Sequence, residues 1–307
     1  VASLGWVTSL VQRAAASQQR INDFLNTEPE IISPTNKPFV IKGAIELKNV
    51  SFTYKDSGLP SEGQFGPQAG IKALTDVSFT IPQGRSLAII GRTGSGKSTI
   101  ANLLCRLIDV DSGEILIDGN NIKTINLYDL RDQIGYVPQE VFLFSDSIAA
   151  NIGFSANDAS KLKTDRSVIE QAAKDAAIYA NIINFPEKFD TIVGERGITL
   201  SGGQKQRISI ARAIIREPRL LIFDDCLSAV DTETEEEILN NLNRLMRNKT
   251  TIVISHRVSS VKNADQIIVL DHGSIVEQGS HPELLSKKGI YFELHQKQLL
   301  EKENQSI

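Results

Sequence analysis

The first 25 residues carry apolar side chains at spacings of three and four. These are Leu4, Val7, Val11, Ala14, Ile21 and Leu25, with Gln18 as the one gap. Such a period predicts a helix with one apolar face. Two interpretations of residues 1–25 stay open: an amphipathic connecting helix that packs on protein, and the end of a last membrane helix, whose exit Trp6, Gln12 and Arg13 would suit. No apolar run reaches the roughly 18 residues that a complete spanning helix needs.

A change of pattern follows this helix. Residues 26–39 contain three prolines and no periodicity, which predicts a linker over residues 26–42. Beyond it, residues 44–54 and 73–81 have the pattern of strands. A stretch rich in Gly, Pro and Ser separates them, so we expect a small antiparallel sheet with a mobile loop between its strands.

Four short apolar runs farther along the chain have the length and composition of buried strands. They are SLAII at 86–90, LLIFD at 220–224, TIVIS at 251–255 and QIIVL at 266–270. Segments of helical period lie between them. This alternation predicts an α/β fold with a mostly parallel sheet flanked by helices.

The composition is that of an ordinary globular protein, with 41% hydrophobic and 23% charged residues. The formal net charge of -4 provides no general basic field, so we expect no nucleic-acid partner. Cys105 and Cys226 lack the spacing of a zinc site and indicate a reducing compartment, by default the cytoplasm. The only methionine is Met246 and the sequence begins with Val1, so we expect a further segment to precede it.

The most specific motif is GRTGSGKST, which follows the SLAII run and precedes apolar residues at helical spacing. In this context it predicts a P-loop that binds a nucleotide with Mg²⁺. Its glycines let backbone amides approach phosphate oxygens, its lysine reaches the β and γ phosphates, and the serine that follows ligates Mg²⁺. The predicted nucleotide-binding residues are Gly91, Thr93, Gly94, Ser95, Gly96, Lys97, Ser98 and Thr99.

The remaining motifs resemble those of the nucleotide-binding domain of ATP-binding cassette (ABC) transporters, over residues 43–292. LSGGQKQR at 200–207 resembles the family signature, and TIVGERG at 191–197 resembles a segment of the exporter subclass. The resemblance implies a P-loop NTPase core, an antiparallel β subdomain and a helical signature subdomain, with residues 293–307 as a polar C-terminal tail. It also implies that Ser201, Gly202, Gly203 and Gln204 contact ATP held by a partner domain. Taken alone, SGGQ is typical of a simple helix cap.

The resemblance assigns roles to single residues as well. Gln139 matches the Q-loop residue that contacts Mg²⁺ or the attacking water, and His256 matches the switch histidine that binds the γ-phosphate. Tyr54 matches the aromatic residue that stacks on adenine, with a buried sheet tyrosine as the alternative. Asp224 matches the Walker B carboxylate that holds Mg²⁺ through water, and Asp231 matches the D-loop residue that faces the partner domain.

Asp225 departs from the family pattern, in which Glu polarises the attacking water. Asp is one methylene shorter, which places its carboxylate about 1 Å or more away, and such a displacement can cost on the order of 10²-fold in rate. We therefore expect slow hydrolysis, with Asp225, His256 and Gln139 as the catalytic residues. A heterodimer with a partner that has the Glu is slightly favoured, whereas the retained His256 would keep a homodimer active.

These observations predict the ATP-hydrolysing domain of an exporter-type transporter at the cytoplasmic face of the cell membrane. Its membrane-spanning domain would precede Val1, and ATP and Mg²⁺ would be its cofactors. A soluble ATPase of the same superfamily is the first alternative, but it leaves TIVGERG and the N-terminal helix unexplained. A P-loop GTPase is the second, but the chain has no NKxD base-reading motif.

Overall fold

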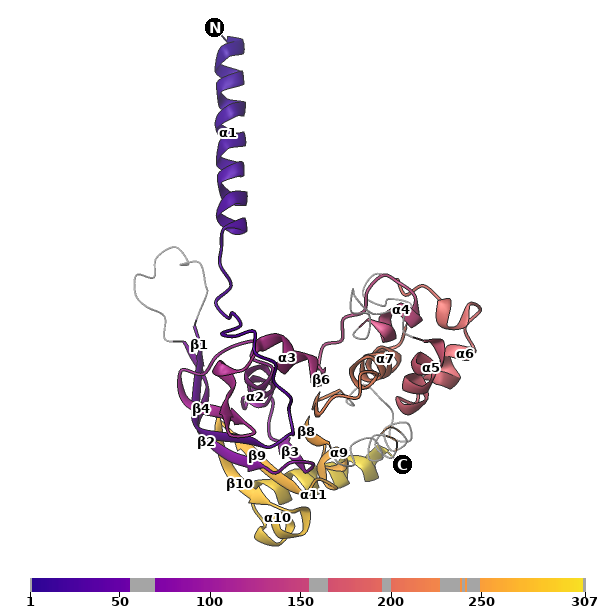
Figure 1. Ribbon diagram of the computed structural model, residues 1–307. Coiled ribbons are helices and arrows are strands. Elements are labelled where there is room, and N and C mark those ends of the chain that lie inside the picture. Colours follow the sequence, from indigo (N-terminus) through magenta and orange to yellow (C-terminus); the bar gives the residue numbers. More distant parts are fainter. Residues whose placement is uncertain are drawn as a thin grey trace. The chain divides into compact units, whose positions relative to one another are not determined.

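The computed structural model describes residues 2–55, 70–154, 165–194, 200–226, 238, 241 and 249–305. The chain divides into two units, Val1–Ile32 and Ser33–Ile307. The first unit contains helix α1 (Ala2–Leu25), which confirms the predicted helix (Figure 1). Its apolar residues Val11 and Leu25 are 61% and 71% exposed. Within the described part of the chain, no helix is both long and apolar enough to cross a membrane.

In the described part of the second unit, an antiparallel sheet has the strand order β2-β1-β4-β5. Its strands are β1 (Ile45–Tyr54), β2 (Ile71–Ile81), β4 (Ser112–Ile117) and β5 (Asn120–Asn121). β1 buries Ile45 and Leu47, then Val50 and Phe52, because an irregularity in the pairing shifts the alternation by one residue. The predicted β subdomain is confirmed. The loop predicted between its first two strands lies mostly outside the described residues.

The second sheet of this unit has the order β10-β9-β3-β8-β7-β6 in the residues that the structure describes. Its strands are β3 (Ser86–Ile90), β6 (Ile134–Val137), β7 (Leu220–Asp224), β8 (Thr250–Ser255), β9 (Gln266–Asp271) and β10 (Ser274–Gly279). All neighbouring pairs are parallel except β9 with β10. All four apolar runs are strands of this sheet, and β7 and β8 are buried at every position. The predicted α/β fold is therefore confirmed.

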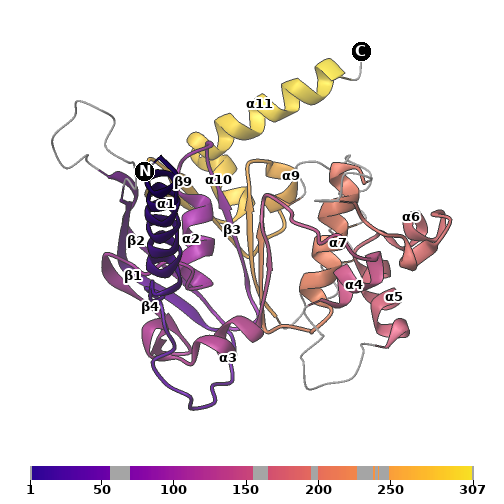
Figure 2. The same ribbon diagram turned by 90° about the horizontal axis from the view of Figure 1, so that it is seen from above.

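Helices lie beside this sheet and in a separate helical layer. Those of the helical layer are α4 (Ile148–Gly153), α5 (Arg166–Asp175), α6 (Tyr179–Ile183) and α7 (Gly202–Ile214), which contact one another (Figures 1 and 2). The others are α2 (Lys97–Leu104), α3 (Leu127–Asp132), α9 (Val258–Val261), α10 (His281–Lys287) and α11 (Ile290–Gln305), with short 3-10 turns at Ile122–Thr124 and Lys188–Asp190. The segment predicted as a polar tail is thus helical as far as Gln305.

The second half of the predicted linker is fixed to the second unit by side chains that accept hydrogen bonds from its backbone. Phe39 N donates to Asp129 Oδ2 over 2.8 Å, and Ile41 N donates to Gln133 Oε1 over 2.9 Å. The Ile41 side chain is buried. These bonds hold the chain against the sheets before β1 begins.

The buried hydroxyl of Thr250 ties this entering segment to the sheet. Its Oγ1 donates to Gly43 O over 2.6 Å and accepts from Gly84 N over 2.9 Å. Gly43 has a φ of +122°, and a Cβ there would lie 2.6 Å from this same Oγ1. Position 43 therefore requires glycine, because any side chain there would collide with the Thr250 hydroxyl.

We predict that Thr250→Val lowers the free energy of unfolding by about 1–3 kcal/mol, because it leaves the buried carbonyl of Gly43 and the partly buried amide of Gly84 unpaired. Urea unfolding followed by circular dichroism measures this change. Thr251→Val is the matched control, since the equally buried Thr251 hydroxyl makes one long contact, 3.5 Å to Lys249 O. Equal losses in both variants would contradict the assignment.

Candidate functional site

A cavity of about 260 Å³ gathers most of the residues that the sequence analysis singled out. They come from the end of β1, the loop after β3, the first turn of α2, the loop after β6, and the ends of β7 and β8. The lining residues among the predicted ones are Tyr54, Thr93, Gly94, Gly96, Lys97, Ser98, Thr99, Gln139, Asp224, Asp225 and His256. Residues as far apart in the sequence as Tyr54 and His256 therefore meet in one place.

The glycines of the P-loop differ in how much space surrounds the position of a side chain. Gly94 has a φ of +81°, and a Cβ there would meet nothing within 4 Å, so its backbone faces open space. Gly96 has a φ of +97°, and a Cβ there would lie 2.3 Å from Ala73 O. Gly91 and Ser95 do not line the cavity, and Ser95 is buried. Of the predicted loop, Thr93, Gly94 and Gly96 thus line the cavity together with Lys97, Ser98 and Thr99.

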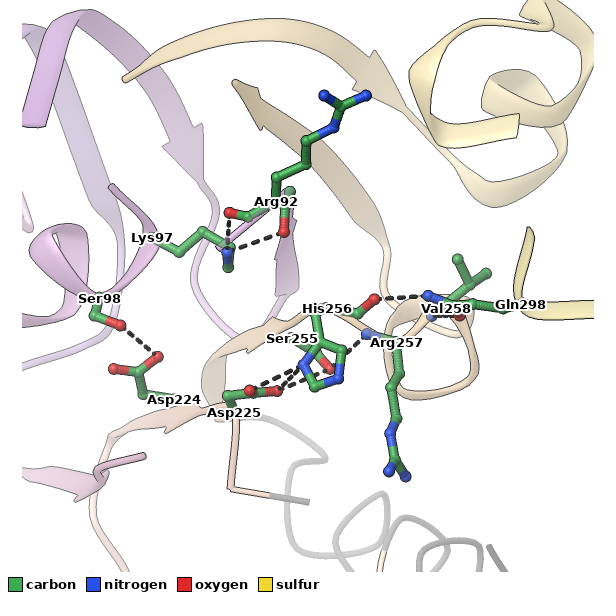
Figure 3. A network of polar contacts seen from close by, with 11 residues as sticks. Arg92, Lys97, Ser98, Asp224, Asp225, Ser255, His256, Arg257, Val258 and Gln298 are labelled. Carbon is green, nitrogen blue, oxygen red and sulfur yellow. Dashed lines mark hydrogen bonds and ion pairs between the residues drawn. The ribbon is translucent and has the colours of Figure 1, made fainter. Parts of the chain in front are cut away.

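The side chain of Lys97 turns back to the start of the P-loop. Its Nζ donates to Gly91 O over 2.9 Å and to Arg92 O over 2.8 Å (Figure 3). Partial burial lowers the pKa of Lys97, against the opposing effect of the Asp225 and Asp224 charges. A phosphate would offer this ammonium a stronger, charge-assisted partner than two neutral carbonyls.

Asp224 is a carboxylate in an almost dry position, with 2% of its surface exposed. Ser98 Oγ donates to its Oδ1 over 3.1 Å. Burial raises the pKa of Asp224, the charge of Asp225 adds to this effect, and the hydrogen bond from Ser98 and the charge of Lys97 oppose it. Hydroxyl, carboxylate and amide oxygens from Ser98, Asp224 and Gln139 line one wall, and these are donors that suit Mg²⁺.

Asp225 and His256 form a close pair beside Asp224. His256 Nδ1 lies 2.9 Å from both carboxylate oxygens of Asp225 (Figure 3). Asp225 has a φ of +45°, a left-handed conformation that Asp adopts more readily than most residues. Its amide donates to Ile254 O over 2.8 Å, which fixes the backbone at the end of β7. The pair therefore joins the ends of two neighbouring strands.

Tyr54 and Gln139 stand at the rim. The Tyr54 ring is 38% exposed and packs edge-to-face on Phe52 with 4.9 Å between centroids. Its Oη lies 3.3 Å from Thr99 Oγ1. A buried sheet tyrosine, the alternative interpretation, does not describe this exposed ring. Gln139 is exposed at the cavity edge.

The signature residues lie elsewhere. Ser201 is the N-cap of α7: its Oγ accepts from Gln204 N over 3.2 Å, and Gln204 Oε1 accepts from Ser201 N over 3.0 Å. None of Ser201, Gly202, Gly203 and Gln204 lines the cavity of its own chain. Asp231 and the end of TIVGERG, residues 195–197, lie outside the described residues.

Sequence reasoning missed one wall of the cavity. Ile71, Lys72 and Ala73, at the start of β2, line it together with the predicted residues. Antiparallel pairing places Ile71 opposite Tyr54 and Lys72 opposite Thr53. Only the strand register brings these residues to the site, and no motif in the sequence reveals that register.

A P-loop between a parallel strand and a helix, with acidic residues at the end of another strand of the same parallel sheet, defines the class of P-loop nucleoside triphosphatases. The ABC transporter family model matches residues 74–228, half of the chain. The chain therefore belongs to the ABC transporter family.

Individual relatives indicate to which part of the ABC transporter family the chain is most similar. Over 289 residues the chain is 46% identical to the ATP-dependent lipid A-core flippase of Vibrio vulnificus (strain CMCP6), an alignment that covers 94% of this chain and 47% of the flippase. It is 43% identical over 311 residues to ABC transporter B family member 6 of Dictyostelium discoideum, covering 97% and 44%. The chain thus spans about half the length of the curated relatives it matches.

A solved structure agrees with them. The structure of a bacterial Atm1-family ABC exporter with ATP bound superposes with a TM-score of 0.83 at 37% identity, covering 96% of this chain and 49% of that one. The chain is an exporter-type nucleotide-binding domain with the ATPase fold of its family. Neither the GTPase nor the soluble ATPase alternative is supported.

We predict that Asp224→Asn stabilises the chain in the absence of nucleotide. Folding raises the pKa of this carboxyl, so its ionised form destabilises the fold; the penalty is absent below the unfolded pKa and is full above the folded pKa. At pH 7.5 we expect a melting temperature about 2–4 °C higher, and a gain that shrinks as the pH falls toward about 4.

Differential scanning calorimetry without Mg²⁺ measures this shift. Glu30→Gln, which removes one negative charge from an exposed position between α1 and β1, is the control and should leave the melting temperature unchanged. A lower melting temperature for Asp224→Asn at pH 7.5 would show that the ionised carboxylate stabilises the ligand-free chain.

Proposed function

We propose that this chain hydrolyses Mg-ATP in the described cavity and drives export through a membrane domain that precedes Val1. The observation that carries the proposal is the single cavity shared by Tyr54, the P-loop, Gln139, Asp224, Asp225 and His256. The domain would act at the cytoplasmic face of the membrane, and its similarity to a lipid A-core flippase and to an ABC exporter supports a role at a membrane. The domain boundaries at 25, 42 and 292 belong to this proposal.

In this proposal the nucleotide lies along the cavity from Tyr54 to Asp225. Adenine stacks on the exposed ring of Tyr54, since aromatic rings favour offset-stacked arrangements. The amides of Gly94 and of the first turn of α2 bind phosphate oxygens, since the N-terminus of a helix favours an anion. Lys97 exchanges its two carbonyl partners for the β and γ phosphates.

Ser98, Gln139 and Asp224 would hold Mg²⁺, Asp224 through water. When bound with ATP, the ion neutralises charge on the phosphates and aligns them for attack. A bound cation would also give Asp224 a positive partner in addition to Lys97. The ammonium of Lys97 donates its hydrogen bonds to backbone carbonyls and not to Asp224.

Asp225 and His256 share the chemical step. Asp225 accepts a hydrogen bond from the attacking water, and His256 donates one to the γ-phosphate. A neutral imidazole that donates from Nδ1 to Asp225 has an acceptor at Nε2, so donation to a phosphate requires the cationic ring. The 2.9 Å contact between His256 Nδ1 and Asp225 links the two side chains, so we assign them a joint role in this step.

The signature requires a second domain. Gly202 and Gly203 open helix α7, whose first amides have no partner within the helix, and they lie away from the cavity of their own chain. A partner domain placed head to tail would bring its ATP to these amides. The shorter Asp225 slightly favours a partner that carries Glu at this position, whereas the Asp225–His256 contact supports an active homodimer.

We predict that the wild-type chain alone hydrolyses ATP slowly, that Asp225→Glu raises turnover several-fold, and that Asp225→Asn lowers it. The longer Glu carboxylate reaches about 1 Å farther toward the water, and such a displacement matters on the scale of 10²-fold in rate. Steady-state ATPase assays of the three proteins measure this, with Lys97→Ala as the inactive reference. A fast wild type that Glu does not improve would remove the argument for a Glu-bearing partner.

We predict that ATP converts the chain to a dimer and that Ser201→Arg prevents it, because a large side chain would fill the space at the start of α7 where the partner's ATP binds. Light scattering of the hydrolysis-impaired Asp225→Asn variant, with and without ATP, measures the mass. Ser201→Thr keeps the capping hydroxyl and is the control. A mass that ATP leaves unchanged at high protein concentration would count against the ATP sandwich.

A further inference from the structure

Helix α11 reaches the backbone of His256 through one side chain, Gln298. Gln298 Nε2 donates to His256 O over 2.7 Å, and Gln298 Oε1 accepts from Val258 N over 2.7 Å. Figure 3 shows both bonds, on the side of His256 away from the P-loop. One amide group therefore joins the C-terminal helix to the turn that carries the predicted switch histidine.

The two bonds define a single orientation of the amide. The backbone carbonyl of His256 only accepts and the amide of Val258 only donates, so the Gln298 nitrogen must face the first and the oxygen the second. A glutamate in this place would direct an oxygen at the His256 carbonyl. Glutamine is the side chain of this length that satisfies both groups.

One backbone amide of the turn is paired by this outside partner. β8 ends at Ser255, and the four-residue helix α9 begins at Val258 with Arg257 as an N-cap that makes no side-chain cap hydrogen bond. Ser255 Oγ accepts from Arg257 N over 3.0 Å. The amide of Val258, which opens the helix, is paired by Gln298 instead.

Helix α11 is itself well anchored, so Gln298 is not a loosely placed group. Tyr291, which is 0% exposed, and the partly buried Leu294 lie three residues apart, and Gln298 follows Leu294 four residues later on the same face of the helix. At the start of the helix, the Glu277 carboxylate accepts hydrogen bonds from Ile290 N and Tyr291 N. The core and β10 thus set the position from which Gln298 reaches His256.

We infer that Gln298 is a positioning residue that holds His256 in place for the reaction from the C-terminal helix. The inference rests on the role of His256 in the proposed function. His256 contacts Asp225 through its ring and Gln298 through its backbone carbonyl. Release of the backbone displaces the ring relative to Asp225 and to the γ-phosphate, while the P-loop and Tyr54, which carry ATP binding, keep their places.

The test measures kcat and KM for ATP in the 307-residue chain carrying Gln298→Ala. We expect kcat to fall about tenfold with KM changed less than about twofold, since a side chain displaced by a fraction of an ångström loses rate before it loses ligand. Gln296→Ala, on an exposed position of the same helix, is the matched control and should keep wild-type kinetics. In a His256→Ala background, Gln298→Ala should cause no further loss, because it acts through the absent ring.

Wild-type kcat in Gln298→Ala, or the same tenfold loss in the His256→Ala background, would overturn the inference. If the wild-type chain hydrolyses no ATP, the proposed function fails, and the placement of His256 is judged without activity. The readout is then the ¹⁵N-histidine spectrum, with the His256 signals assigned by their loss in His256→Ala. Shifted His256 signals in Gln298→Ala but not in Gln296→Ala would support the inference, and unshifted signals in both would overturn it.

Discussion

The site depends on one constraint: three parallel strands lie side by side, and whatever follows each of them must emerge at the same edge. β3 pairs with β8 so that Ile90 faces Ser255, and β7 pairs with β8 so that Asp224 faces Ile254. The P-loop follows Ile90, Asp225 follows Asp224, and His256 follows Ser255. Backbone hydrogen bonds thus fix the separation of these groups before any side chain contributes.

The same edge collects charges that oppose folding. Asp224 is almost fully buried next to a second carboxylate, and the pKa of Asp224 is raised for that reason. Ser98 and Lys97 compensate within the chain, but Lys97 directs its hydrogen bonds at backbone carbonyls. This excess of negative charge favours the binding of a divalent cation. The cost of burying ionised Asp224 in the ligand-free chain and the proposed affinity for Mg-ATP therefore have the same origin.

Much of this arrangement could be predicted from the sequence because it is encoded in dense local patterns. Apolar runs specify the strands, and the GRTGSGKST spacing specifies a loop between a strand and a helix. By contrast, the wall made by Ile71, Lys72 and Ala73 depends on a register that pairing irregularities shift. Gln298 was missed for another reason: both of its partners are backbone groups, which every residue possesses, so no complementary residue type marks the contact.

Ser201 and Gln298 each accept a hydrogen bond from a backbone amide at the start of a helix. Each side chain therefore stabilises the fold and also lies in or next to the proposed site. Ser201 completes a capping box that α7 needs in any case by pairing the amide of Gln204, and Gly202 and Gly203 lie between these two residues. Gln298 satisfies the first amide of α9, which has no cap of its own. In both places the backbone of a helix start provides unpaired groups. In α7 the partner that we propose for these groups is the ATP of a second domain, whereas in α9 the amide of Val258 is paired by Gln298, which links the segment after His256 to the C-terminal helix.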